Sequence, residues 1–256
     1  MTVHLLDLSH NNGGTVDFHK VKAGGYDAVI LKATQASSFV DPAFHVRAKA
    51  AKAAGLIVGA YHFAGNGKGV LGNVHTEYDH FAVTIAGYDI DVRVLDIEVG
   101  AGPSTWASVF RQQMKPTDWT YSTDAMFRGV LRHQQGTRWV ARVGPGGRPG
   151  SIPPHNPWTI WQNSWTTRVP GVPGVCDTSI FRSSLLDFQR LLGLVSTDHP
   201  HKPPSGKQYG WVEKADNGSV YTFAHRRGVT GKQVLALNPG IHPFALRLHQ
   251  RLRIRR

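Results

Sequence analysis

The segment Val92-Arg93-Val94-Leu95-Asp96-Ile97-Glu98 is an apolar, β-branched run that ends in two carboxylates. It predicts a short buried strand. Successive side chains of a strand point to opposite faces, so Asp96 and Glu98 should share one face, opposite to Leu95. Two acids buried on one face would repel each other and lose hydration. The pair is therefore expected either at a polar cleft where acids do chemistry, or as a helix cap beside a solvated neighbour.

Similar apolar runs recur along the chain and alternate with helical patterns up to residue 193. Strands are expected at 3–8, 28–32, 56–62, 92–97, 119–122, 139–143, 158–162 and 174–177, and helices near 17–23, 42–54, 70–85, 105–114, 124–133 and 183–192. Apolar strands that alternate with helices are typical of a parallel sheet covered on both faces, and about eight suit a closed (β/α) barrel of the TIM kind. Because the stretch 144–157 is rich in Gly and Pro, the last strands should be joined by loops and the barrel should be irregular.

The 256-residue chain carries a net charge of +12 that is unevenly distributed. A polar, Pro-containing stretch at 196–207 predicts a linker between a barrel unit, 1–195, and a small α+β unit, 208–256. Residues 196–256 hold 4 Lys and 7 Arg against 3 acids, a net charge of +8. Such a tail favours a polyanionic partner, which could be nucleic acid, anionic lipid or an anionic cell wall. Neither a signal peptide nor a membrane-spanning run is recognisable, so we expect a protein made in the cytoplasm that does not insert into membranes. We also expect it to be a monomer.

Four carboxylates follow strands of the expected barrel. In a parallel barrel the carboxyl ends of the strands build a shared mouth where catalytic groups lie. The acids are found at the ends of strands one, four and eight: Asp7, Asp96, Glu98 and Asp177. Strands one and eight are neighbours in a closed barrel, so Asp7 and Asp177 should be close. Four acids around one mouth suit glycosidic bond cleavage, which needs one protonated and one ionised carboxyl group, and crowding would raise at least one pKa.

Aromatic side chains gather near the same strand ends. The third strand ends in Tyr61, His62 and Phe63, the fifth ends at Tyr121, and Trp158, Trp161 and Trp165 flank the seventh. Aromatic rings offer apolar faces to sugars and polar edges to their hydroxyl groups. The alternative, that an individual ring belongs to the core, stays open for each of them.

Taken in order, these segments resemble the family 25 glycoside hydrolases, the lysozymes that cut peptidoglycan and are common as phage endolysins. The similar segments are Asp7-Leu8-Ser9-His10-Asn11 and residues 30–34, 41–44, 54–63, 95–98, 121–122, 139–142, 158–162 and 175–181. No single motif is decisive, but the ordered set is specific.

The resemblance implies a role for each matching position. Glu98 is similar to the proton donor to the leaving sugar oxygen, and Asp96 to its ionised partner, which orients the substrate's N-acetyl group. Asp7 and Asp177 are similar to the supporting acids of the family cleft. The residues expected to bind the sugars are Tyr61, His62, Tyr121, Trp161 and Gln162. Neither a metal nor a cofactor is implied.

The chain departs from the family's pattern at two places. Gln35 follows Lys32-Ala33-Thr34 where the family usually has Glu, which puts a charge at that position in doubt, and Val143-Gly144 stands where a Tyr is frequent. The stereochemical course stays open, because residues two apart on a strand lie roughly 6.5–7 Å apart, between retaining and inverting spacings. Participation of the substrate's own acetamido oxygen would need no protein nucleophile, and this is the route we favour.

The C-terminal unit resembles a LysM repeat, a module that binds N-acetylglucosamine-containing glycans. The similar segments are residues 220–224, 228–230, 235–239 and 252–254, whereas the usual Gly-Asp-Ser/Thr before the first helix is present only as Asp216-Asn217-Gly218-Ser219. The alternative is a basic unit held to anionic wall polymers by charge. The resemblance to phage lysins further implies an enzyme that acts on bacterial peptidoglycan after release by a holin-type protein.

Other functions would require other residues. A metal-dependent amidase needs His ligands, but His75 and His80 are five apart on an expected helix and do not share a face. A Cys–His peptidase would use Cys176, which lies in an expected strand and not at a helix N-terminus. A non-catalytic wall-binding protein should lack an acid of the pair, and a nucleic-acid binder should bind DNA in a salt-dependent way. We therefore predict an N-acetylmuramoyl hydrolase without a nucleic-acid partner.

Overall fold

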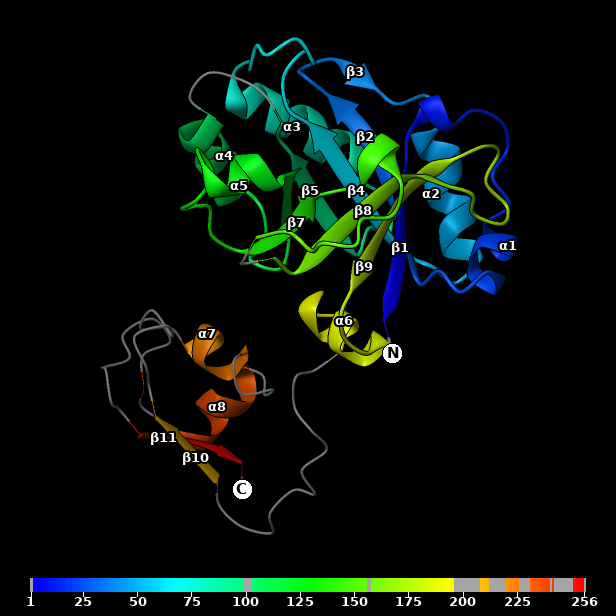
Figure 1. Cartoon of the computed structure of the whole chain (residues 1–256). Helices are drawn as coiled ribbons and strands as arrows, with labels where there is room; N and C mark the ends of the chain where they lie inside the picture. Colours follow the sequence, from blue (N-terminus) through cyan, green and yellow to red (C-terminus); the bar gives the residue numbers. More distant parts are fainter. Residues whose placement is uncertain are drawn as a thin grey trace. The chain divides into compact units, whose positions relative to one another are not determined.

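Eight strands of the first unit close into a barrel (Figure 1). Their order around the ring is β1-β9-β8-β7-β6-β5-β4-β2, and the pairing of β1 with β2 closes it. The strands are β1 (Val3–Leu8), β2 (Ala28–Gln35), β4 (Ile57–Phe63), β5 (Val92–Asp96), β6 (Trp119–Thr123), β7 (Thr137–Ala141), β8 (Ile160–Thr167) and β9 (Cys176–Phe181); the short β3 (Phe39–Val40) pairs with β2 outside the ring. The predicted closed barrel is confirmed.

The last strand runs in the opposite direction to the others. Neighbouring strands from β1 through β2 and β4 to β8 pair in parallel, whereas β9 is antiparallel to both β8 and β1. The prediction of a wholly parallel sheet is therefore wrong for β9. The segment 168–175, which contains Pro170 and Pro173, is too short for the crossover that a parallel pair needs. As a result Asp177 lies at the start of β9 and not at its end, and the reversal brings it to the same mouth.

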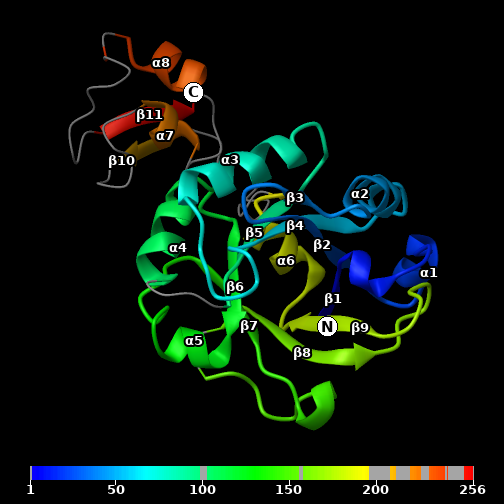
Figure 2. The same cartoon turned by 90° about the horizontal axis from the view of Figure 1, so that it is seen from above.

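Helices cover the outside of the barrel (Figure 2). They are α1 (Phe18–Ala23), α2 (Phe44–Ala53), α3 (Val74–Ile85), α4 (Pro103–Gln112) and α5 (Asp124–Arg128). The side chains of Asp17, Asn73 and Thr123 cap α1, α3 and α5 by accepting backbone N–H bonds. A further helix, α6 (Leu185–Leu191), lies across one end of the barrel in both views. The link between β7 and β8 contains the short 3₁₀ turn Pro145–Gly147, in line with its predicted irregularity.

Side-chain alternation divides the strands into an inner and an outer set. The inner set forms an apolar plug with two residues of the α6 region: Val3, Leu5, Ala28, Ile30, Val92, Val94, Trp119, Trp139, Ile160, Phe188 and Leu192. The outer set, which includes Leu6, Val29, Val58 and Leu95, packs with helix residues such as Phe44, Phe81 and Phe110. Along β1 the inner series Val3, Leu5 continues with Asp7, and along β5 Val92, Val94 continues with Asp96. The barrel is thus filled with apolar side chains up to the level at which the acids begin.

The structure, a computed structural model, describes residues 2–98, 103–155, 158–195, 208–211, 220–225, 231–239, 241 and 251–255. The chain divides into two compact units, Met1–Val195 and Ser196–Arg256. The expected linker 196–207, the Asp216–Ser219 segment with its turn, and residues 228–230 lie outside the described residues. Within the described part, none of the helices is long and apolar enough to cross a membrane.

The described residues of the second unit form a strand, two helices and a strand, in the predicted order. They are β10 (Gln208–Trp211), α7 (Val220–His225), α8 (Gly231–Leu237) and β11 (Arg251–Arg255), and β10 pairs antiparallel with β11. Its core contains the buried residues Val220, Phe223, Ala224, Val234 and Leu252. The element order agrees with the α+β unit expected from the sequence, and the LysM resemblance stays a prediction.

Candidate active site

The mouth of the barrel holds a polar cleft of about 190 Å³. The side chains that line it come from β1, β2, β4, β5, β6, β7, β9 and the residues that directly follow β1 and β5: Asp7, Ser9, Asn11, Lys32, Tyr61, Phe63, Asp96, Glu98, Tyr121, Trp139 and Asp177. All four acids named from the sequence are among them. The predicted meeting of Asp7, Asp96, Glu98 and Asp177 at one mouth is therefore confirmed.

Asp7 and Asp177 lie directly opposite each other in the β1–β9 pair and are bridged by Gln162. Gln162 Nε2 donates to Oδ2 of Asp7 at 3.0 Å and to Oδ2 of Asp177 at 3.2 Å. Its Oε1 accepts from the Tyr121 hydroxyl at 2.8 Å. Burial, together with the facing Asp177, raises the pKa of Asp7 well above its usual value. Burial and the charge of Glu98 raise the pKa of Asp177 to about 6.

The Asp96–Glu98 pair is the less completely hydrogen-bonded part of the cleft. Asp96 is only 7% exposed, and among the described residues its Oδ1 has no hydrogen-bond partner. Burial, followed by the charge of Glu98, raises the pKa of Asp96 well above its usual value. Burial also raises the pKa of Glu98, against the opposing effects of a hydrogen bond to Asp96, the Lys32 charge and a hydrogen bond to Tyr121. The pair is thus built to hold a proton at a pH where free carboxyl groups are ionised.

Two of the predicted sugar-binding rings lie in the cleft, together with two that were not predicted. Tyr61 and Tyr121 line it as expected, and Phe63 and Trp139 join them. The indole of Trp139 is fixed by its Nε1, which donates to Ser179 Oγ at 2.9 Å. Burial and nearby carboxylates raise the pKa of both tyrosine hydroxyls, so these hydroxyls stay protonated and able to donate.

His62 does not reach the cleft, contrary to the expectation from the sequence. Its ring lies on the outer face of β4, is completely buried, and stacks on Phe110 with ring centroids 5.1 Å apart. Its Nε2 bonds to Glu77 Oε2 at 2.9 Å and its Nδ1 to Thr34 Oγ1 at 2.8 Å. Alternation along β4 turns Tyr61 and Phe63 inward and His62 outward.

Glu77, the partner of His62, holds the loop that follows β4. Besides the imidazole, its carboxylate accepts the backbone N–H of Gly65 at 2.8 Å and of Gly72 at 2.7 Å. Burial alone would raise the pKa of Glu77, but these hydrogen bonds outweigh it and the pKa is lowered. Burial lowers the pKa of His62. The ionised carboxylate of Glu77 therefore accepts a hydrogen bond from Nε2–H of the neutral His62 imidazole. This pair anchors the strand end that carries Tyr61 and Phe63.

Trp161 is also placed outside the cleft. It lies between Ile160 and Gln162, which are the inward residues of β8, so alternation turns its indole outward. Trp161 is 4% exposed, donates from Nε1 to the carbonyl oxygen of Arg142 at 2.7 Å, and contacts Trp158. The expected sugar contact of Trp161 is therefore not met. Gln162 contributes by positioning the two acids, since it is not among the lining residues.

The sequence interpretation missed Lys32 as a cleft residue, although the signal was available. Lys32 follows Ala28 and Ile30 on the inner face of β2 and lies at the same level as the acids. Cys176, by contrast, is buried on the outer side of β9, and burial raises the pKa of its thiol to about 12. It lies in a strand, as expected, and a buried thiol with a raised pKa does not suit a cysteine nucleophile.

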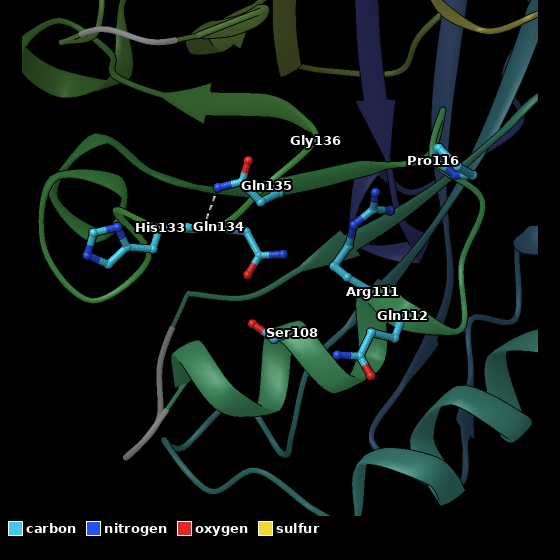
Figure 3. Close-up of a pocket in the computed structure, with 8 residues that line it drawn as sticks. All are labelled: Ser108, Arg111, Gln112, Pro116, His133, Gln134, Gln135 and Gly136. Carbon is cyan, nitrogen blue, oxygen red and sulfur yellow. Dashed lines mark hydrogen bonds between the residues drawn. The ribbon is translucent and has the colours of Figure 1, made fainter. Parts of the chain in front are cut away.

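A larger hollow of about 410 Å³ lies between α4 and the residues before β7 (Figure 3). It is lined by Ser108, Arg111, Gln112, Pro116, His133, Gln134, Gln135 and Gly136. Figure 3 shows one hydrogen bond between these residues, from Gln135 Nε2 to the His133 carbonyl oxygen at 3.0 Å. No carboxylate lines this hollow, so it lacks the acid pair that glycosidic chemistry needs.

Residues 6–172 match the family described as glycosyl hydrolases family 25. The chain belongs to this family. The matched region contains Asp7, Asp96 and Glu98, whereas Asp177 follows it. The resemblance inferred from the ordered motifs is therefore confirmed, and with it the assignment of the chain as a glycoside hydrolase.

Two curated relatives of this family 25 chain are lysozymes. Lysozyme M1 of Streptomyces globisporus is 29% identical over 219 residues, which cover 75% of this chain and 70% of that protein. The autolytic lysozyme of Clostridium acetobutylicum is 33% identical over 96 residues, 37% of this chain and 28% of that protein.

Solved structures share the barrel. The bacterial lysozyme from Streptomyces coelicolor aligns with a TM-score of 0.60 and 26% identity, covering 75% of this chain and 96% of that one. The catalytic domain of an endolysin from a Listeria monocytogenes bacteriophage aligns with a TM-score of 0.63 and 22% identity, covering 75% and 98%. These alignments leave about a quarter of this chain uncovered.

Proposed function

We propose that this family 25 chain is an N-acetylmuramidase that hydrolyses the β-1,4 bond between N-acetylmuramic acid and N-acetylglucosamine in bacterial peptidoglycan. The observation that supports it most is the Asp96–Glu98 pair, two carboxyl groups with raised pKa in a cleft lined by aromatic rings. A glycosidase needs such a pair to supply one proton and one negative charge.

Glu98 is proposed as the proton donor. It lines the cleft, is less buried than Asp96, and has a raised pKa. Its proton passes to the glycosidic oxygen while the bond between that oxygen and the sugar C1 breaks, so the leaving sugar departs with a neutral hydroxyl group.

Asp96 is proposed to bind the acetamido N–H of the sugar that is attacked. Its buried Oδ1 lacks a donor among the described residues, and an amide N–H would supply one. A donor at Oδ1 favours the ionised form of Asp96 and so leaves the shared proton to Glu98. The acetamido oxygen then bonds to C1 to form an oxazolinium ion. A water molecule attacks C1 and breaks this bond, and the Glu98 carboxylate takes a proton from that water. Two displacements at C1 predict retention of configuration.

Asp7 and Asp177 are proposed to stabilise the positive charge that develops on the sugar. Gln162 fixes both carboxylates on the β8–β9–β1 side of the mouth. Preorganised charge of this kind lowers the barrier because it needs no rearrangement during the reaction. Tyr61, Phe63, Tyr121 and Trp139 would hold the sugar rings.

Reducing ends released from purified peptidoglycan test the proposal. Borohydride reduction of the products should convert N-acetylmuramic acid, and not N-acetylglucosamine, into its alditol. New amino groups without new reducing ends would indicate an amidase or peptidase, and N-acetylglucosaminitol would indicate the opposite bond specificity. Proton NMR of the first product should show the β anomer if the acetamido route is correct.

The C-terminal unit is proposed to anchor the enzyme to the wall. The net charge of +8 over residues 196–256 and the β-α-α-β order of the described elements support either a LysM-like glycan site or binding to anionic wall polymers. The full chain and a variant ending at residue 195 should turn over small soluble fragments equally, while the shorter one sediments less with walls. Binding that persists in high salt and on walls stripped of anionic polymers favours the glycan site. The wall of a bacterial host, reached after holin-type release, is the proposed place of action.

A further inference from the structure

Lys32 is a cation placed among the acids of the cleft. Of the described residues that line the cleft, it is the only Lys or Arg. It lies on the inner face of β2, two positions beyond Ile30, and its side chain is 8% exposed. Asp96 and Glu98 face it from β5 and the residues after it, and Asp41 faces it from the segment before α2. Among the described residues, Asp7, Asp177, Tyr61 and Tyr121 complete the ionisable lining.

The environment of Lys32 holds the ammonium without neutralising it. Nζ donates to Gln35 Oε1 at 2.7 Å and lies over the rings of Phe63 at 4.8 Å and Phe39 at 5.7 Å. Both types of contact are with uncharged groups. In the described part of the chain, Lys32 makes no ion pair within 4.0 Å. Asp41 is already engaged by His10 and by the backbone N–H of His10 and Ala43.

Gln35 is the residue that decides how much of this charge reaches the cleft. An amide oxygen orients an ammonium group but leaves its charge intact. A carboxylate at the same 2.7 Å contact would form an ion pair and cancel most of the field at longer range. In a partly desolvated cleft, a unit positive charge favours the ionised form of nearby carboxyl groups.

We propose that Lys32 is a positioning residue which keeps one carboxyl group of the Asp96–Glu98 pair ionised while the other carries the proton. The neutral side chain of Gln35 orients the Lys32 ammonium group without neutralising its charge. The inference rests on the proposed function, because it assigns a role within the same acid pair. It explains how the Asp96–Glu98 pair, buried beside two further acids, can hold one proton and one negative charge at the same time.

The pH dependence of kcat/KM separates this role from a structural one. Removing the charge in Lys32→Met should raise the pKa values of both Asp96 and Glu98, and so move both limbs of the bell-shaped profile to higher pH by about one unit. Lys32→Arg retains the charge and should restore the position of the limbs even if its maximal rate is lower. Gln35→Glu should move the limbs in the same direction as Lys32→Met, by a smaller amount.

The matched control is Gln35→Met, which removes the hydrogen bond but adds no charge. It should leave both limbs in place, and a shift equal to that of Gln35→Glu would mean that the hydrogen bond matters and not the charge. The proposal would be overturned if Lys32→Met lost rate uniformly across pH. It would also be overturned if the pH profile of Lys32→Arg coincided with that of Lys32→Met.

A titration without substrate keeps the inference separate from the proposed function. Carbon-13 NMR follows the titration of the labelled Asp and Glu carboxyl groups, and the signals lost in Asp96→Asn and Glu98→Gln identify those of the pair. In Lys32→Met, the titrations of these two signals should move to higher pH. If the wild type lacks muramidase activity but these titrations move, the proposed function fails while the charge role stands. If the enzyme is active and the titrations do not move, the charge role fails alone. Circular dichroism and thermal melting establish that each variant is folded.

Discussion

Two buried carboxyl groups on opposite faces of the barrel wall differ in how completely they are hydrogen-bonded. Glu77, on the outside, is completely buried, and both of its oxygens accept hydrogen bonds, Oε2 from His62 and Gly65 and Oε1 from Gly72. Asp96, on the inside, is 7% exposed, and within the described residues its Oδ1 accepts none. The pKa of Glu77 is lowered, whereas that of Asp96 is raised well above its usual value.

The difference shows that burial of an acid does not by itself indicate a catalytic site. A fully hydrogen-bonded carboxylate stabilises the loop and the strand end that it joins. A carboxyl group that lacks donors and faces other acids retains the capacity to exchange a proton and to bind a donor from a substrate. Variants on the two faces should therefore separate activity from stability.

The largest effect is expected for Glu98→Gln. If Glu98 donates the proton, the amide should lower kcat on peptidoglycan by about 10³-fold, within the range of general acid catalysis. The melting temperature should not fall, because the amide cannot carry the negative charge that repels the neighbouring carboxylates. Release of reducing ends measures the first and thermal denaturation the second. A fully active variant would remove Glu98 from the mechanism.

Glu77→Gln should show the opposite pattern. Loss of the carboxylate disturbs a buried hydrogen-bonded group and should lower the free energy of unfolding by about 3 kcal/mol. The folded fraction should keep most of its specific activity at low temperature, because Glu77 does not line the cleft. Urea denaturation and initial rates test the two statements. A stable but inactive Glu77→Gln protein would contradict the separation of the faces.

Asp177→Asn should stabilise the barrel in a pH-dependent way. The pKa of Asp177 is about 6 in the folded state, against an ordinary value of 3.8. Between these two values the folded state therefore binds a proton that the unfolded state has lost. Stability therefore falls as pH rises through this window. The variant lacks this penalty and should be more stable at pH 7 by on the order of 2 kcal/mol.

The stabilisation by Asp177→Asn should disappear below about pH 4, where the carboxyl group is protonated in both states. Urea denaturation at the two pH values provides the comparison. An equal gain at both would show that packing, and not the ionisation of Asp177, is responsible.

The smallest effects concern one aromatic residue on each face of the barrel wall. Tyr61→Phe removes a hydroxyl group in the cleft and should raise KM about threefold, the equivalent of one net hydrogen bond. Trp161→Phe alters only the outer face of β8 and should leave KM unchanged. A reversed result would mean that the sugar extends over the β7–β8 loop.

The sequence alone determined the closed barrel, most of its strands and helices, and the acids that line its mouth. Period-two alternation and apolar strand runs are local properties, so Asp7 and Asp96 could be placed on the inner face from their neighbours. The same alternation puts Tyr61 and His62 on opposite faces of one strand, so only one of these two residues could line the mouth. Applying it to Trp161 required the bounds of β8, which begins later and extends further than expected.

Only the tertiary structure decided the direction of β9, the bridging of Asp7 and Asp177 by Gln162, and the contact of Lys32 with Gln35. The direction of β9 follows from the end of β8 at Thr167, five residues beyond its expected end, which leaves a connection too short for a parallel crossover. The pKa of a carboxyl group depends on charges and hydrogen bonds brought from distant segments. Glu77 and Asp96 are both acids in the sequence, and only the folded chain makes one an anchor and leaves the other short of a partner.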